Sequence, residues 1–164
     1  MKLEILSKQE LDLHEKVLKL EGTLEEKSDK VVYFGISKQY MEIYQSYSEL
    51  VAENIEAVKR GLFISWYSKV EPIGLTGIGF LQREAEEQIF RNIDQRLGSK
   101  NVDFELEWML DHYSAWNFAF GSISEFSNLK KQLEREIKIV PPSLVEMSEM
   151  NGRGQMGLYW KSFE

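Results

Sequence analysis

The sequence predicts an all-α fold, a single compact domain of about six helices over residues 1–164. Apolar residues recur every three or four positions through most of the chain, which is the spacing of one helix face. Three Ser-x-x-Glu patterns have the form of capping boxes that open helices, at Ser7–Glu10, Ser122–Glu125 and Ser143–Glu146. An α+β fold is the alternative, because short β pieces fit the apolar runs at 31–34 and 158–160.

The first helix is expected to open at Ser7 and to run to about Leu20. Within it, Glu10 and His14 are one turn apart, which suits an ordinary pair on a helix surface. The charged stretch 21–30 is predicted to be a turn-rich connection. The run 31–34 that follows is a strand or a buried loop, since periodicity cannot decide over four residues.

A helix capped by Ser37 has the clearest amphipathic pattern in the chain. Its apolar face consists of Tyr40, Tyr44, Tyr47, Val51, Ile55, Val58 and Leu62. Its acidic residues lie on the opposite face: Glu42, Glu49, Glu53 and Glu56. Gly61 either breaks this helix or lets another helix pack closely, and the apolar residues that continue to Tyr67 predict a central position.

Pro72 ends that helix, because proline cannot continue it, and a glycine-rich, apolar loop follows over 72–79. The next helix is predicted over Leu81–Leu97, where apolar residues recur every four positions, and Gly98 is its natural stop. A further helix is expected from near Asn101 to about Tyr113, with 115–120 as an extension.

The C-terminal third is expected to hold two capped helices separated by prolines. The helix opened by Ser122 buries apolar residues as far as Ile137, and the pair Pro141-Pro142 forbids its continuation. The short helix opened by Ser143 is predicted to end at Asn151-Gly152.

The segment Gly152–Gly157 spells G-x-G-x-x-G, the fingerprint of dinucleotide-binding folds. In such folds the glycines follow a strand and open a helix whose N–H groups face a pyrophosphate. Here they follow a predicted helix, and seven residues remain where an acidic position about 20 residues later is needed. We therefore expect a turn and no cofactor, with 158–160 returning to the core. Arg153, inside this turn, is a candidate anion contact.

Three carboxylates, Asp103, Glu107 and Asp111, are four residues apart, so a helix places them on one face. Such a face can ligate a divalent cation, and His112 beside it could add acid–base chemistry. The alternative is a solvated outer face, since bulky neighbours supply the inner one. Asp111 and His112 are thus the candidate catalytic residues. Asp103, Glu107 and Asp111 are the candidate metal ligands, although we expect no bound metal.

Aromatic residues make up 12% of the chain, and most have the helical spacing of a packed core. The alternative is a binding groove or interface, because tyrosine and tryptophan anchor interfaces. On that interpretation the candidate binding residues are Tyr40, Tyr44, Tyr47, Trp66 and Trp116.

Charge and composition limit the possible binding partners and the possible cellular location. The net charge is −7, spread over the chain, and no block of lysine or arginine is present, so we expect no nucleic acid partner. An acidic surface attracts a basic partner. The chain has no cysteine, which excludes disulfides. No run approaches the roughly 20 apolar residues that cross a bilayer, so we expect a cytoplasmic protein without membrane contact.

These observations support three hypotheses about function. The favoured one is a small acidic protein that acts by protein–protein binding, as an adaptor, an inhibitor or a toxin-neutralising protein, with self-association left open. The second is an enzyme that uses the carboxylate and histidine cluster at 103–112. The third is a small-molecule binder with an aromatic pocket between helices.

Overall fold

The computed structural model describes residues 2–121, 123–135 and 147–163. Within these ranges the protein consists of α-helices and 3₁₀ helices without a strand, which confirms the all-α prediction. The α-helices are α1 (Lys2–Leu18), α2 (Leu24–Tyr33), α3 (Ile36–Leu50), α4 (Ile55–Val70), α5 (Ile73–Thr76), α6 (Arg83–Gly98), α7 (Phe104–Tyr113), α8 (Ser127–Glu134) and α9 (Gly154–Lys161). The 3₁₀ helices are η1 (Ser114–Phe120) and η3 (Met147–Met150).

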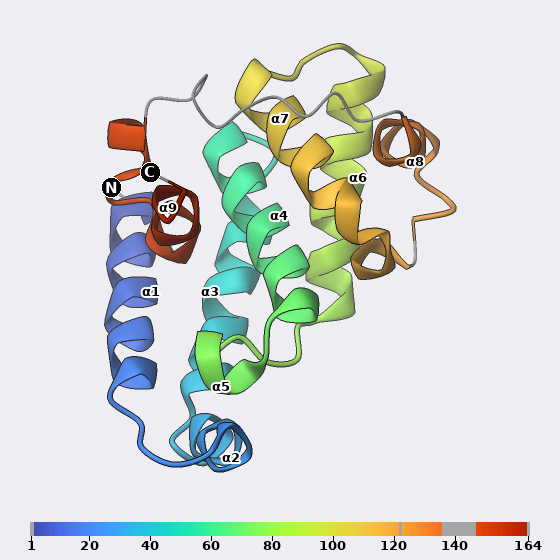
Figure 1. The fold of residues 1–164 in the computed structure, drawn as a ribbon. Helices are drawn as coiled ribbons and strands as arrows, with labels where there is room; N and C mark the ends of the chain where they lie inside the picture. The colour runs from blue at the N-terminus through green and yellow to red at the C-terminus, as the bar shows by residue number, and fades with distance from the viewer. Residues whose placement is uncertain (1, 122, 136–146, 164) are drawn as a thin grey trace.

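Helix α4 lies at the centre of the fold (Figure 1). It packs against α3, α6, α7, η1 and α9, and its residues from Ala57 to Trp66 are buried without interruption. Helices α1 and α9 lie side by side on one flank, and α6, α7 and α8 form the other (Figure 1). The buried apolar residues form one contiguous core, as expected for a single domain.

Gly61 lies inside α4 and lets α6 approach closely. A Cβ atom added there would stand 2.7 Å from Cδ1 of Ile89 on α6. Of the two roles considered for this glycine, close packing is therefore the one that the structure shows.

The predicted 37–62 helix is two helices in the structure, α3 and α4. The side chain of Asn54 accepts a hydrogen bond from the backbone N–H of Glu56 at 2.9 Å, so it caps the start of α4. The N-cap of α3 is Gly35, with φ of +70°, and the predicted cap Ser37 lies inside the helix. Asn54 thus marks the start of a second helix, but the apolar pattern continues across it and predicts a single one.

Both predicted β pieces are helical. Residues 31–33 are the last residues of α2, Phe34 is its C-cap, and 158–160 lie inside α9. The charged stretch predicted to be a connection opens α2, because Thr23 and Glu26 form a capping box. The apolar run at 31–34 therefore leaves Val32, Tyr33 and Phe34 on the surface.

The predicted capping boxes do not open helices in the described residues. Ser7 is buried within α1, five residues after that helix begins. Ser122 lies outside the described residues, and α8 begins at Ser127, where Asp94 of α6 accepts from the N–H groups of Asn128 and Leu129. The third box, its proline pair and Ile137 also lie outside the described residues. Across the described ranges, no helix has the length and apolar character needed to span a membrane.

Candidate functional site

The three tyrosines of α3 fill the core. Tyr40, Tyr44 and Tyr47 are completely buried, and each hydroxyl has a partner within the chain. Tyr44 shares a hydrogen bond of 2.6 Å with Ser65 of α4. Burial raises the pKa of all three phenols. These side chains hold helices together and offer no surface to a partner.

Trp66 is likewise a core residue. Its ring stacks on Tyr113 with 4.5 Å between centroids and meets Trp116 edge to face at 5.3 Å. Trp116 is partly buried against this cluster, in η1. The two predicted binding tryptophans therefore contact each other inside one aromatic assembly.

The candidate metal ligands Asp103 and Asp111 are engaged by different parts of the chain. Asp103 is the N-cap of α7, where Oδ1 accepts from the N–H of Leu106 at 2.8 Å and Oδ2 from Nζ of Lys59 at 2.6 Å. Asp111 accepts two hydrogen bonds from the guanidinium of Arg135, at 2.9 and 2.5 Å. Among the described residues, no group of three or more histidine, aspartate or glutamate side chains is placed to hold a metal ion.

His112 faces away from Asp111, into the aromatic assembly. Its Nε2 shares a hydrogen bond of 2.7 Å with the hydroxyl of Tyr159 on α9. Trp160 and Phe163 lie against the same imidazole. Burial lowers the pKa of His112 to about 4, so the ring is neutral near pH 7. The structure therefore separates the predicted catalytic pair and gives each member its own structural partner.

Arg153 is held by two carboxylates of the chain itself. Its Nε and Nη2 donate to Glu56 at 2.7 and 2.6 Å, and its Nη1 and Nη2 donate to Glu105 at 3.1 and 2.5 Å. Burial opposes the charge of Arg153, but these hydrogen bonds raise its pKa. Its guanidinium thus joins α9 to α4 and α7 and is already occupied, so the predicted anion contact is an internal one.

The glycine-rich segment around Arg153 does open a helix, α9, but the preceding element is η3 rather than a strand. Its first N–H groups meet α1: Gly154 donates to Oγ of Ser7 at 2.8 Å, and Gln155 donates to Oε2 of Glu10 at 3.1 Å. A carboxyl group of the chain therefore lies at the helix N-terminus, where a dinucleotide-binding fold holds a phosphate. The prediction of a Glu10–His14 pair on the helix surface is wrong, because Glu10 of α1 is buried against the start of α9.

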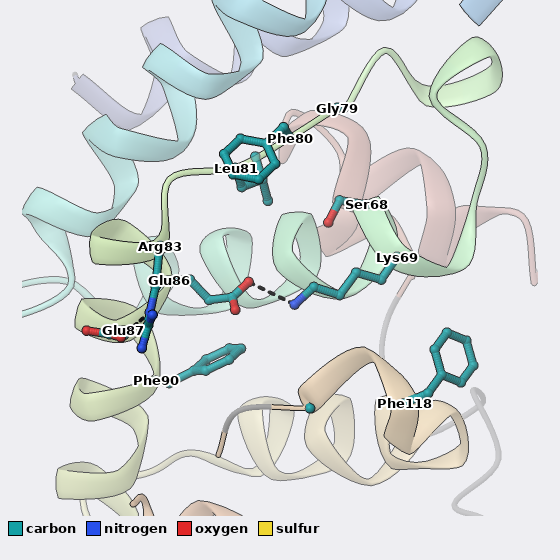
Figure 2. Close-up of a pocket in the computed structure, with 11 residues that line it drawn as sticks. Ser68, Lys69, Gly79, Phe80, Leu81, Arg83, Glu86, Glu87, Phe90 and Phe118 are labelled. Atoms are coloured by element: carbon teal, nitrogen blue, oxygen red, sulfur yellow. Dashed lines mark hydrogen bonds and ion pairs between the residues drawn. The ribbon is translucent and has the colours of Figure 1, made fainter. Parts of the chain in front are cut away.

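The described elements build an open groove between the central helix and its neighbours (Figure 2). It has a volume of about 770 Å³ and lies between the end of α4, the 79–81 segment, the start of α6, and η1. Phe80 and Phe118 line it while leaving 82% and 64% of their surface exposed. Phe90 adds a buried aromatic ring to its wall.

Charged side chains cross the groove between the aromatic ones (Figure 2). Nζ of Lys69 donates to Glu86 at 2.9 Å and to the backbone oxygen of Ala119 at 3.0 Å, so it ties η1 to α6. At the outer edge, Arg83 donates to Glu87 at 2.8 Å. The groove thus combines exposed aromatic rings with charged side chains held by hydrogen bonds.

Sequence reasoning did not find this groove, although one signal pointed toward it. The apolar loop 72–79 leads directly into Phe80, and an apolar loop is either tucked inside or left for a partner to cover. The other wall comes from η1, which follows two further helices along the chain, so only the fold brings them together. None of the predicted binding residues lines it.

Comparisons with protein-family models, with curated proteins and with solved structures give no match.

Proposed function

We propose that this protein acts by binding another polypeptide in the groove between α4, α6 and η1. The observation that carries the proposal is the pair of exposed phenylalanines, Phe80 and Phe118, on one hollow surface. Exposed aromatic rings grouped at one place on a folded domain mark interaction sites, because burying them against a partner removes apolar surface from water.

The charges around the groove favour a basic partner segment. Arg83 stands in the field of three carboxylates, those of Glu87, Glu125 and Glu84, so negative charge exceeds positive charge at this edge. The whole chain carries −7, which adds a long-range attraction for a positively charged partner. The proposed occupant is therefore a segment with an aromatic or aliphatic anchor flanked by lysine or arginine, met in the cytoplasm.

A display library of random peptides tests this proposal, because it samples many combinations of anchor and charge at once. We expect selection on the wild-type protein to enrich peptides that combine an apolar anchor with lysine or arginine. In Phe80→Ser and Phe118→Ser, their affinity should fall by about thirtyfold, since truncating an aromatic anchor costs about 2 kcal/mol.

The matched control is Tyr33→Ser, because Tyr33 is 84% exposed but belongs to α2 and does not line the groove. Peptides that bind all four proteins equally would contradict the proposal. Sedimentation of the wild-type protein alone tests whether the groove binds a second copy of this chain. If the protein forms a dimer that Phe80→Ser dissociates, the occupant is a second copy and not a different protein.

A further inference from the structure

Two side chains of α1 supply the N-cap of α9. Oγ of Ser7 accepts from the N–H of Gly154 at 2.8 Å and donates to the backbone oxygen of Gly152 at 2.5 Å. Glu10 accepts from the N–H of Gln155. Arg153, the residue at the N-cap position of α9, makes no side-chain capping bond. The helix N-terminus is therefore satisfied from another element of the fold.

The backbone of α9 comes so close to Glu10 that only glycine fits at the contact. Gly154 has a φ of +63°, and a Cβ added to it would stand 2.5 Å from Oε1 of Glu10. The carboxyl group is consequently sealed from solvent, and Glu10 keeps 1% of its surface exposed.

The groups that face Glu10 come from every helix packed around it. On α3, the hydroxyl of Tyr47 donates to Oε1 at 2.5 Å, and that of Tyr40 donates to the backbone oxygen of Glu10 at 3.1 Å. Arg60 and Glu56 on α4 act on Glu10 through their charges; His14 is one turn further along α1, and Arg153 immediately precedes α9.

Arg60 contacts Tyr47, the hydrogen-bond partner of Glu10, and its charge also acts on Glu10. Its Nη1 lies 3.5 Å from the Tyr47 oxygen, while its Nε is engaged by Glu56 at 2.7 Å. Among the described residues, no lysine, arginine or histidine forms an ion pair with Glu10. A buried carboxylate without a direct counter-ion is costly, so burial favours a neutral carboxylic acid here, against the hydrogen bonds from Tyr47 and Gln155 that favour the charged form.

We propose that Glu10 is a proton-operated latch that holds α9 on α1. In the closed form the carboxyl group is protonated: the short hydrogen bond with Tyr47 then runs from Glu10 to the phenol oxygen, the reverse of its direction for a carboxylate, while the other carboxyl oxygen still accepts from the N–H of Gln155. When α9 leaves, Glu10 meets water and releases its proton. Closing the latch therefore takes up one proton, and a rise in pH loosens α9.

The direction and the pH window follow from the burial of the group. Burial raises the pKa of Glu10 from 4.5 to about 7, against the opposing effects of Tyr47, Gln155 and Arg60. Between these values the closed state holds a proton that the open state has lost. The latch is thus tightest below about pH 4.5, loosens as pH rises toward 7, and changes little above that.

Amide hydrogen exchange of α9 measures the latch in the intact chain. After correction for intrinsic exchange rates, we expect the opening constant of α9 to rise by up to about tenfold per pH unit between pH 5 and 7. In Glu10→Gln, which keeps the shape of the side chain but cannot ionise, the constant should be independent of pH. In Ser7→Ala it should be larger at every pH, with the wild-type slope.

The control for a simple loss of charge is Glu149→Gln, at an exposed position in η3, which should keep the wild-type slope. An unchanged slope in Glu10→Gln would overturn the proposal. If that variant does not fold, the NMR chemical shift of the Glu10 carboxyl carbon can be followed against pH in the wild-type protein. Titration of Glu10 near pH 7 supports the latch, and titration below pH 5 refutes it.

Discussion

Replacing Arg153 by methionine tests the bridge that joins α9 to α4 and α7. The variant keeps the apolar stem but removes four charge-assisted hydrogen bonds to Glu56 and Glu105. Breaking a buried ion pair costs about 3–5 kcal/mol, because the other charge stays buried without its partner. Here Glu56 keeps Arg60 at 2.7 Å, and Glu105 keeps Lys59 at 3.0 Å. We therefore expect a loss of about 2–4 kcal/mol.

Urea unfolding, followed by circular dichroism, measures this loss as a lower midpoint at an unchanged slope. Lys8→Met is the control, since it removes an exposed, solvent-screened pair with Asp12 on α1 and should cost far less stability than Arg153→Met. A double-mutant cycle of Arg153→Met with Glu105→Gln should give a coupling energy of about 1–2 kcal/mol. The reasoning is refuted if Arg153→Met costs no more than Lys8→Met.

Three further outcomes are expected. Gly61→Ala should lower the melting temperature, because overpacking against Ile89 at 2.7 Å costs about 1–3 kcal/mol and outweighs the gain in helix propensity; an unchanged melting temperature would contradict this. The imidazole resonances of His112 should titrate near pH 4 and not near 6.5, since burial lowers its pKa. As pH falls, His112 becomes protonated near pH 6.5 in the unfolded chain but only near pH 4 in the folded protein. The free energy of unfolding should therefore decrease between pH 6.5 and 4, and His112→Gln should show a smaller decrease. Lys69→Met should speed amide exchange in η1 and leave α1 unchanged, because Lys69 ties the oxygen of Ala119 to Glu86; equal exchange in η1 would remove Lys69 as a positioning residue of the groove.

Helices with one strong stripe and a clear end could be predicted from the sequence. The expected helix Leu81–Leu97 with its stop at Gly98 agrees closely with α6, and Pro72 ends α4 as expected. Prediction failed where helix ends depended on tertiary contacts. The pattern Ser7–Glu10 has the spacing of a local capping box, yet both side chains cap another helix far along the chain. Nothing local distinguishes these two uses of the same residues.

The candidate site was harder to predict because its residues owe their roles to neighbours that are distant in sequence. Asp111, His112 and Arg153 are chemically able side chains, and the sequence could nominate them. Their partners Arg135, Tyr159 and Glu105 come from other elements, so the fold decides that they are engaged. The sequence did not predict a role for Phe80 and Phe118, because an isolated phenylalanine does not by itself indicate a binding surface.

The capping of α9 by α1 also sets an order of events during synthesis. Ser7 finds its donor 147 residues later, at Gly154. At about 5–20 residues per second, a ribosome needs roughly 7–30 s to make that stretch. Throughout this interval the side chains of Ser7 and Glu10 lack the N–H donors of α9, although α3, which also packs on α1, is made much earlier. The contact between α1 and α9 can therefore form only after the other described helices have been made.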